Sequence, residues 1–336
     1  MPTRPDRPRG GRSLLRCGSL LVGVDFSSTP TPRKPITAAI GRWHDADPLP
    51  EYRLDEVVPL ASLAGFEAFL RTAGPWIGGF DLPFGQPRDL IEHEGWPTEW
   101  EACVRHYCSL PRPLLREAFR SWCAARPPGD KFAWRAADRP AGSSPAMRWT
   151  NPPVAWMMHA GIGRMLDAGL AFPAHRHPGG RRLPPDGRVA LEAYPGFTAR
   201  QVCRTSYKSD LAAGQTADRR GNRRAIVAAL VAGRAGLDLR LTIDTAWRRR
   251  LIADGRGDLL DAVICAMQAG HAAALDDYGL PPKLDPLEGW IAAVPGGGAG
   301  GAHGRAPGRR VRLPRLKEPR HVRQGQGRPL TRKKLR

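Results

Sequence analysis

The sequence predicts an α/β fold in which helices flank a mixed β-sheet. Two observations support this class. Short segments rich in Val, Ile, Leu and Phe, of the length of buried strands, alternate with longer segments whose apolar residues recur at helical spacing. Several of the strand-like segments also end in, or contain, a single acidic residue. A charge in a buried strand is costly unless it is paired or binds a cation, so these acids are candidate functional residues.

Four strands and one helix are predicted in the first part of the chain. Residues 21–29 contain the first strand, in which Asp25 interrupts an apolar, β-branched run before a Ser-Ser-Thr-Pro turn. Residues 35–43 and 51–58 predict the second and third strands, and residues 60–72 predict a helix. The fourth strand begins at residue 76 and carries a second carboxylate, Asp81. Pro83 ends it, because proline has no N–H for the sheet ladder.

A long mixed segment, residues 86–186, then interrupts the strand pattern. Helices are predicted at residues 96–107, 114–125 and 154–170, with a loop of little periodicity at 127–153. We interpret this segment as a mainly helical insertion after the fourth strand that covers one edge of the sheet. A fifth strand at 188–192 contains Glu192 and is followed by a Pro-Gly turn. The remaining helices are expected at 222–235, 244–253 and 257–275, and residues 288–295 pack the end of the fold.

The acidic residues form a set. Asp25, Asp81 and Glu192 belong to strands, whereas Asp258 and Asp261 are three residues apart in the first turn of the last helix, on one face. The preference of helix N-termini for acids explains Asp258 but not Asp261, whose neighbours are apolar. Three strands, a helix, an acid-ended strand and a helix with an acid pair occur in this order in RNase H-like folds, in which acids gather at one edge of a mixed sheet. The sequence therefore predicts an RNase H-like sheet.

A carboxylate cluster of this kind predicts a cation, because the acids would otherwise repel one another. Carboxylate oxygens are the ligands that Mg²⁺ and Mn²⁺ prefer. Two such ions, roughly 3.5–4 Å apart, can activate water and stabilise the leaving oxygen of a phosphodiester. We expect two ions of Mg²⁺ or Mn²⁺, with Asp25, Asp81, Asp258 and Asp261 as metal ligands. Glu192 either completes the ligands or orients them, and all five acids are candidate catalytic residues.

Six segments of the chain together resemble one protein family. They are GVDFS (23–27), GFDLPFGQPR (79–88), NPPV (151–154), EAYPG (192–196), YKSD (207–210) and DLLDAV (258–263). The chain resembles domain-of-unknown-function family 429 over about residues 20–294, and this family is regarded as predicted nucleases with an RNase H-like fold. The resemblance implies this fold and nuclease activity. It also implies that the five acids occupy the family's acidic positions, and that Lys208 and the Arg223-Arg224 pair occupy its basic positions.

Three basic residues are candidates for substrate binding. Lys131, Arg135 and Lys208 could clamp a phosphate or stabilise a developing charge, and solvated surface charge is the alternative for each. Phe132 and Trp134 lie between two of them and could stack on nucleobases. The other aromatic residues of the insertion predict a helical core, because they recur at helical spacing.

The net charge of +20 is concentrated at the two ends of the chain. Residues 1–16 carry five Arg against one Asp, and residues 296–336 carry thirteen Lys and Arg against one Glu. We interpret both ends as disordered basic tails around one RNase H-like domain, residues 17–295. Such tails suit sequence-independent binding to nucleic acid, with a solvated Arg-rich extension as the alternative.

The cysteine pattern and the apolar segments limit the cellular compartments in which the protein is expected. The six cysteines are scattered without a Cys-x-x-Cys pair, which disfavours a zinc ribbon and a secreted disulfide framework. Arg16 breaks the one apolar stretch that resembles a signal peptide, and no run approaches the length of a membrane span. We expect a cytoplasmic protein without a membrane partner. His175 and His177 have no third ligand nearby and predict an exposed loop rather than a metal site.

Two functions remain open on the sequence. The first is a metal-dependent nuclease that hydrolyses phosphodiesters of DNA or RNA with the carboxylate cluster. The alternative is a non-catalytic RNase H-like protein that binds nucleic acid or acts as a scaffold, with the acids as a structural cation site. An ATPase of the actin and sugar-kinase type is disfavoured, because the residues after Asp81 and Glu192 do not form a Gly-rich phosphate loop.

Overall fold

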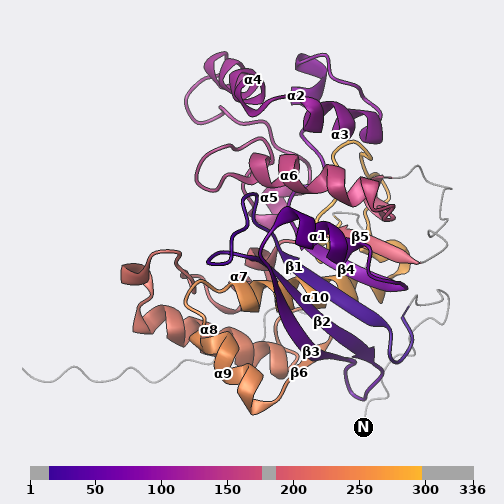
Figure 1. Cartoon of the computed structure of the whole chain (residues 1–336), viewed down its shortest axis with the longest axis vertical. Coiled ribbons are helices and arrows are strands. Elements are labelled where there is room, and N and C mark those ends of the chain that lie inside the picture. The colour runs from indigo at the N-terminus through magenta and orange to yellow at the C-terminus, as the bar shows by residue number, and fades with distance from the viewer. Residues whose placement is uncertain (1–14, 176–186, 297–336) are drawn as a thin grey trace, which may run out of the picture. The chain divides into compact units, whose positions relative to one another are not determined.

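A six-stranded mixed sheet forms the centre of the computed structural model, which describes residues 15–175 and 187–296 (Figure 1). The strands are β1 (Leu20–Asp25), β2 (Ile36–His44), β3 (Glu51–Leu60), β4 (Trp76–Asp81), β5 (Arg188–Glu192) and β6 (Arg240–Thr242). Their spatial order is β5-β4-β1-β2-β3-β6. Strands β1 to β3 form an antiparallel meander, β4 and β5 run parallel to β1, and β6 runs parallel to β3. The predicted fold class, an RNase H-like α/β sheet, is confirmed.

The helices of the described residues follow the predicted order, with short additions. They are α1 (Leu63–Leu70), α2 (Arg88–His93), α3 (Trp100–Ser109), α4 (Arg112–Ala124), α5 (Asp138–Ala141), α6 (Val154–Asp167), α7 (Pro195–Val202), α8 (Ala217–Val231), α9 (Thr245–Ala253) and α10 (Asp258–Ala273). The prediction missed α2, α5 and β6, which are too short for a clear period, and α7, whose first residues it assigned to a Pro-Gly turn. The expected Pro-Gly turn after β5 is wrong, because Pro195 and Gly196 open α7. Proline is tolerated in the first turn of a helix, where its missing N–H has no intrahelical partner.

The two faces of the sheet pack into two apolar clusters. Successive strand residues point to opposite faces, so Val22 and Val24 join one cluster while Leu21 joins the other. The first cluster contains α1 and the helices of the insertion, and the second contains α8, α9 and α10. Figure 1 shows α1 and α10 on opposite sides of the sheet.

The insertion reaches both an edge and a face of the sheet. As predicted, it covers the β5 edge: the Ala171 N–H donates to Arg188 O at 2.9 Å, and the Ala190 N–H donates to Ala171 O at 2.8 Å. Its helices, however, join the cluster on the α1 face. A Cβ atom on Gly161 of α6 would approach Leu82 and Phe26 within 3.0 Å, so α6 packs against the residues that follow β4 and β1. The insertion therefore lies beside the carboxyl ends of the central strands.

Helix α10 contacts the sheet backbone to backbone. Gly23 of β1 and Gly79 of β4 are register partners. A Cβ atom on Gly23 would lie 2.1 Å from Ala262 O, and one on Gly79 would lie 2.2 Å from Cys265 O. Only glycine fits at these two positions, and this close approach fixes the first turn of α10 at the ends of β1 and β4.

We expect Gly23→Ala to lower the free energy of unfolding by roughly 1–3 kcal/mol or more, because its methyl group meets the backbone of α10, which cannot rotate away. Gly221→Ala in α8 is the matched control. A Cβ atom there has no neighbour within 4 Å, and alanine is about 1 kcal/mol more favourable than glycine inside a helix. Urea unfolding of both variants measures the effect. Equal stability of the two variants would contradict this packing.

The ends of the predicted domain differ slightly from the described structure. The sequence places Leu15 in the basic tail, yet its side chain is buried in the cluster that contains α10. Arg16 is also described, whereas residues 1–14 of the expected N-terminal tail and residues 297–336 of the expected C-terminal tail lie outside the described residues. None of the helices in the described segments combines the length and apolar character needed to cross a membrane.

Candidate active site

Asp25 and Asp81 end two adjacent parallel strands and are register partners in the sheet. Neighbouring strands lie about 4.8 Å apart, so the two residues are as close as the sheet allows. Residues two apart in a strand point to the same face, and Gly23 and Gly79 contact α10. Both carboxylates therefore lie on the side of α10, and both are partly exposed.

The first turn of α10 brings Asp258 and Asp261 to the same place. Asp261 is fully buried, and its two carboxylate oxygens accept hydrogen bonds from the Tyr207 hydroxyl and the Lys208 ammonium group. Asp258 is 9% exposed, and its Oδ2 lies 3.2 Å from Arg256 Nε in an ion pair. The same Oδ2 is buried and accepts no hydrogen bond from any described residue.

The loop that carries Lys208 is fixed from two sides. Arg223 of α8 is 2% exposed and donates to the main-chain oxygens of Tyr207, at 2.6 Å, and Ile252, at 2.9 Å. Gly257 has a positive φ of 80°, and a Cβ atom there would lie 2.9 Å from Lys208 Cβ. The family resemblance implies that Arg223 occupies one of the family's basic positions, and in this structure Arg223 supports the loop from the interior.

Burial and mutual repulsion raise the pKa of the strand-end acids. Burial raises the pKa of Asp81 to about 7, with Lys208 opposing the shift and Asp261 and Glu192 adding to it. The pKa of Asp25 is raised well above its ordinary value, chiefly by burial, again with Lys208 opposing. Among the described residues, neither carboxylate has a hydrogen-bond partner. Two such carboxylates are available for a cation or a proton.

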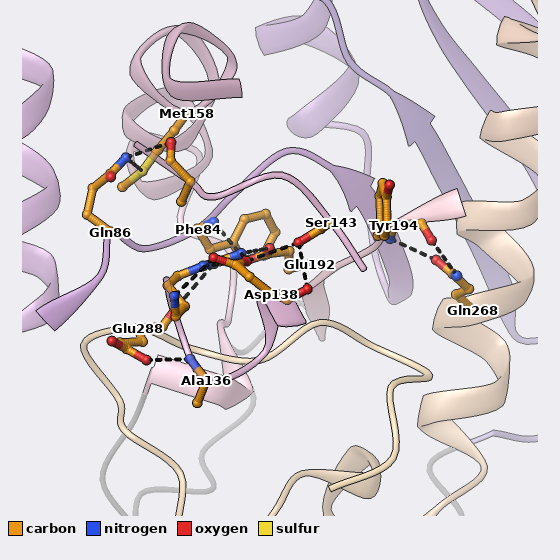
Figure 2. Close-up of polar contacts among 12 residues, drawn as sticks. Phe84, Gln86, Ala136, Asp138, Ser143, Met158, Glu192, Tyr194, Gln268 and Glu288 are labelled. Atoms are coloured by element: carbon orange, nitrogen blue, oxygen red, sulfur yellow. Dashed lines mark hydrogen bonds and ion pairs between the residues drawn. The ribbon is translucent and has the colours of Figure 1, made fainter. Parts of the chain in front are cut away.

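Glu192, by contrast, is part of a buried structural network (Figure 2). It is 5% exposed, and its oxygens accept hydrogen bonds from Arg135 at 2.6 and 2.8 Å and from the Phe84 N–H at 2.9 Å. Arg135 is 2% exposed and also binds the fully buried Asp138 at 2.8 Å. Burial alone would lower the pKa of Arg135, but Asp138 and Glu192 raise it, so the guanidinium stays charged.

The network also ties the last described segment to the insertion. Glu288 accepts hydrogen bonds from the Arg88 N–H and the Ala136 N–H, each at 2.9 Å, and Figure 2 shows the second of these contacts. Arg135 donates to Glu288 O at 3.3 Å. Arg135, which was expected to bind substrate, thus faces protein oxygens on every side, and Glu192, an expected catalytic acid, has its oxygens engaged.

The remaining candidates of the insertion lie away from the acids. Lys131 is exposed, and its charge lowers the pKa of Cys123 in α4, against the larger raising effect of burial. Phe132 packs beside Trp149 at a ring distance of 6.2 Å and belongs with the core. Trp134 is half-buried under the Arg139 guanidinium, 4.7 Å from its ring centre. No contact of the described residues joins these side chains to Asp25 or Asp81.

His175 is another correction. The predicted exposed loop is wrong for this residue, which is 7% exposed and stacks on Trp100 with ring centres 4.2 Å apart. Its Nδ1 lies 2.8 Å from Pro286 O, which assigns the proton to Nδ1, and burial lowers its pKa to about 3. His175 is therefore neutral and structural. His177 lies outside the described residues.

The sequence interpretation missed Tyr207 and Arg256 as site residues. Tyr207 directly precedes Lys208 in the YKSD segment, and Arg256 is two residues before Asp258. Their closeness in the sequence to Lys208 and Asp258 was the only signal that could have indicated them. The contacts of both with α10 depend on how the loops fold back, which no periodicity encodes.

The fit of a divalent cation depends on which acids are free. In the part of the chain that the structure describes, no group of three or more His, Cys, Asp or Glu residues is arranged to hold a metal ion. Mg²⁺, however, commonly binds proteins through one or two carboxylates and completes its octahedron with water and substrate phosphates. Asp25 and Asp81 provide such a pair, and Asp258, whose Oδ2 is ion-paired with Arg256, lies on the adjoining turn. The donor chemistry fits one hard cation at the strand ends.

The raised pKa of Asp81 predicts how stability depends on pH. The native state holds a proton that the unfolded state has lost, so the free energy of unfolding falls as the pH rises from about 4 to about 7. The loss is on the order of a few kcal/mol, and Asp81→Asn reduces it. Urea unfolding in EDTA at several pH values measures the slope, with Asp55→Asn, on an exposed part of β3, as control. An unchanged slope in Asp81→Asn contradicts the assignment.

Comparisons with known proteins give no information on the function, so the function must be inferred from the geometry of the site. No protein-family model matches the chain, and searches of curated proteins and of solved structures find no match.

Proposed function

We propose that this protein is a metal-dependent phosphodiesterase that cleaves nucleic acid at the ends of β1 and β4. The observation that carries the proposal is the Asp25–Asp81 pair, in register on adjacent parallel strands and without hydrogen-bond partners among the described residues. The RNase H-like sheet and the acids of α10 support it. The basic composition of residues 1–16 and 296–336 supports a polyanionic substrate.

Each site residue has a definite task in this proposal. Asp25 and Asp81 would hold a divalent cation, which supplies Lewis-acid stabilisation of the phosphoryl oxygens and lowers the pKa of water. Lys208, whose side chain is 41% exposed, would place a positive charge next to the scissile phosphate. Tyr207 and Asp261 fix the Lys208 ammonium group. Glu192 and Arg135 support the wall of the site and do not contact the substrate.

Cleavage of end-labelled single- and double-stranded DNA and RNA tests the proposal. The full chain is incubated with Mg²⁺ or Mn²⁺, and with EDTA as control. We expect cleavage of at least one substrate, dependent on the metal. Bound metal without turnover on any of the four substrates would instead support the non-catalytic, cation-binding alternative. A cytoplasmic location stays a prediction of the sequence.

A further inference from the structure

The four acids at the strand ends fall into two pairs with different partners. Asp258 and Asp261, both on α10, each have a cationic side chain of the same chain against them, Arg256 and Lys208 respectively. Asp25 and Asp81 have no ion pair with any described residue. The chain therefore neutralises two of the four carboxylates by itself, and the remaining charge equals that of one divalent cation.

The ammonium group of Lys208 is held in a position from which its charge acts on Asp25, Asp81 and Asp261. Its ammonium group donates to Asp261 Oδ2, and its charge acts on both Asp25 and Asp81. Arg223 fixes the main chain of the preceding residue, and Gly257 leaves room for the aliphatic stem. The surrounding residues therefore hold the Lys208 ammonium group in a fixed position. A freely moving surface lysine would not have these supports.

A second metal ion at this site would need Asp261. Both oxygens of Asp261 already accept hydrogen bonds, one from Lys208 and the other from Tyr207. The described residues accordingly contain no group of three acids arranged for metal binding. A second ion would have to displace Lys208 and break a hydrogen-bonded ion pair in which the acid is fully buried.

We propose that Lys208 takes the place of a second metal ion, so that the site binds one divalent cation, on Asp25 and Asp81, rather than two. The inference rests on the proposed function and replaces the two-ion arrangement that the acid count alone predicts. In it, Lys208 is a fixed cation that also keeps Asp261 out of the metal coordination.

The inference is tested without any activity measurement by measuring Mn²⁺ binding to the full chain, with equilibrium dialysis for the number of ions and electron paramagnetic resonance for their coupling. We expect one Mn²⁺ per chain with the spectrum of an isolated ion, and loss of this ion in Asp25→Asn. In Lys208→Met, Asp261 Oδ2 loses its hydrogen-bond partner and becomes available to a metal ion, and we expect about two Mn²⁺ per chain with a spectrum broadened by their mutual coupling. Lys208→Arg keeps a cation and keeps one ion.

A matched control separates the site from general charge effects. Lys34→Met removes the same side chain from another Lys–Asp pair, Lys34–Asp210 at 2.7 Å, in which both side chains are exposed. It should leave one ion per chain. Two coupled ions in the wild-type protein, or one ion in a folded Lys208→Met, would overturn the inference and leave the proposed nuclease standing. Absence of Mn²⁺ from the wild-type protein would overturn the proposed function itself. If Lys208→Met does not fold, the wild-type and Lys208→Arg stoichiometries still decide.

Discussion

Arg135→Met is expected to destabilise the fold by about 3–5 kcal/mol, because it leaves Glu192 and Asp138 buried without their shared counter-charge. A typical domain of this kind has a free energy of unfolding of roughly 5–15 kcal/mol, so the loss is a large part of the total. Urea unfolding followed by tryptophan fluorescence, which several buried tryptophans permit, measures it.

The matched control is Arg42→Met. Arg42 of β2 is paired with Asp55 of β3 at 3.3 Å, but both side chains are about half exposed and water solvates either charge when its partner is removed. We therefore expect an unfolding midpoint close to that of the wild type. Glu192→Gln is informative in addition, because it keeps an oxygen for the Phe84 N–H while removing the charge. Equal effects of Arg135→Met and Arg42→Met would contradict the structural role of the network.

The network distinguishes Glu192 and Arg135 from Asp25 and Asp81, with which the sequence groups them in one candidate site. Glu192 ends a strand beside Asp81, as a metal ligand would, and the sequence contains nothing that separates the two acids. The difference is a partner 57 positions away in the chain, Arg135, which comes from a loop of little periodicity. Patterns of two and 3.6 residues report which side of an element is buried. They do not report which loop residue reaches a buried acid.

The fold itself was predictable for the opposite reason. Strands β1 to β5 and helices α1, α6 and α10 are long and apolar enough for their period to be read, and their order defines the sheet. The juxtaposition of Asp25 and Asp81 also followed, because parallel strands place these two acids at one end of the sheet. The pairing of Asp258 and Asp261 with cationic side chains could not be predicted from the sequence. It depends on a loop held by Arg223 and on Gly257, whose missing side chain leaves space for Lys208.

Asp25→Asn is expected to lower the rate of metal-dependent cleavage by about 10³-fold or more. A metal ion supplies several kcal/mol of charge stabilisation in the transition state, and each 1.36 kcal/mol corresponds to a factor of ten. Asparagine has the shape of aspartate but one neutral oxygen donor in place of a carboxylate. The Asp25–Asp81 pair would then lack the charge needed to bind the cation.

The same substitution should stabilise the fold in EDTA, which distinguishes a functional acid from a structural one. At pH 7 the ionised Asp25 carboxylate is disfavoured by burial and by Asp81 and Asp261, so the neutral amide removes an unfavourable interaction. We measure cleavage with Mg²⁺ and thermal unfolding in EDTA on the same preparation, with the exposed Asp55→Asn as control for both. Lost cleavage with a raised melting temperature assigns Asp25 to chemistry, because a structural carboxylate would lose stability on substitution. Unchanged cleavage in a folded Asp25→Asn would place the reaction elsewhere on the molecule. Lost cleavage with a lowered melting temperature would indicate that Asp25, like Glu192, has a structural role.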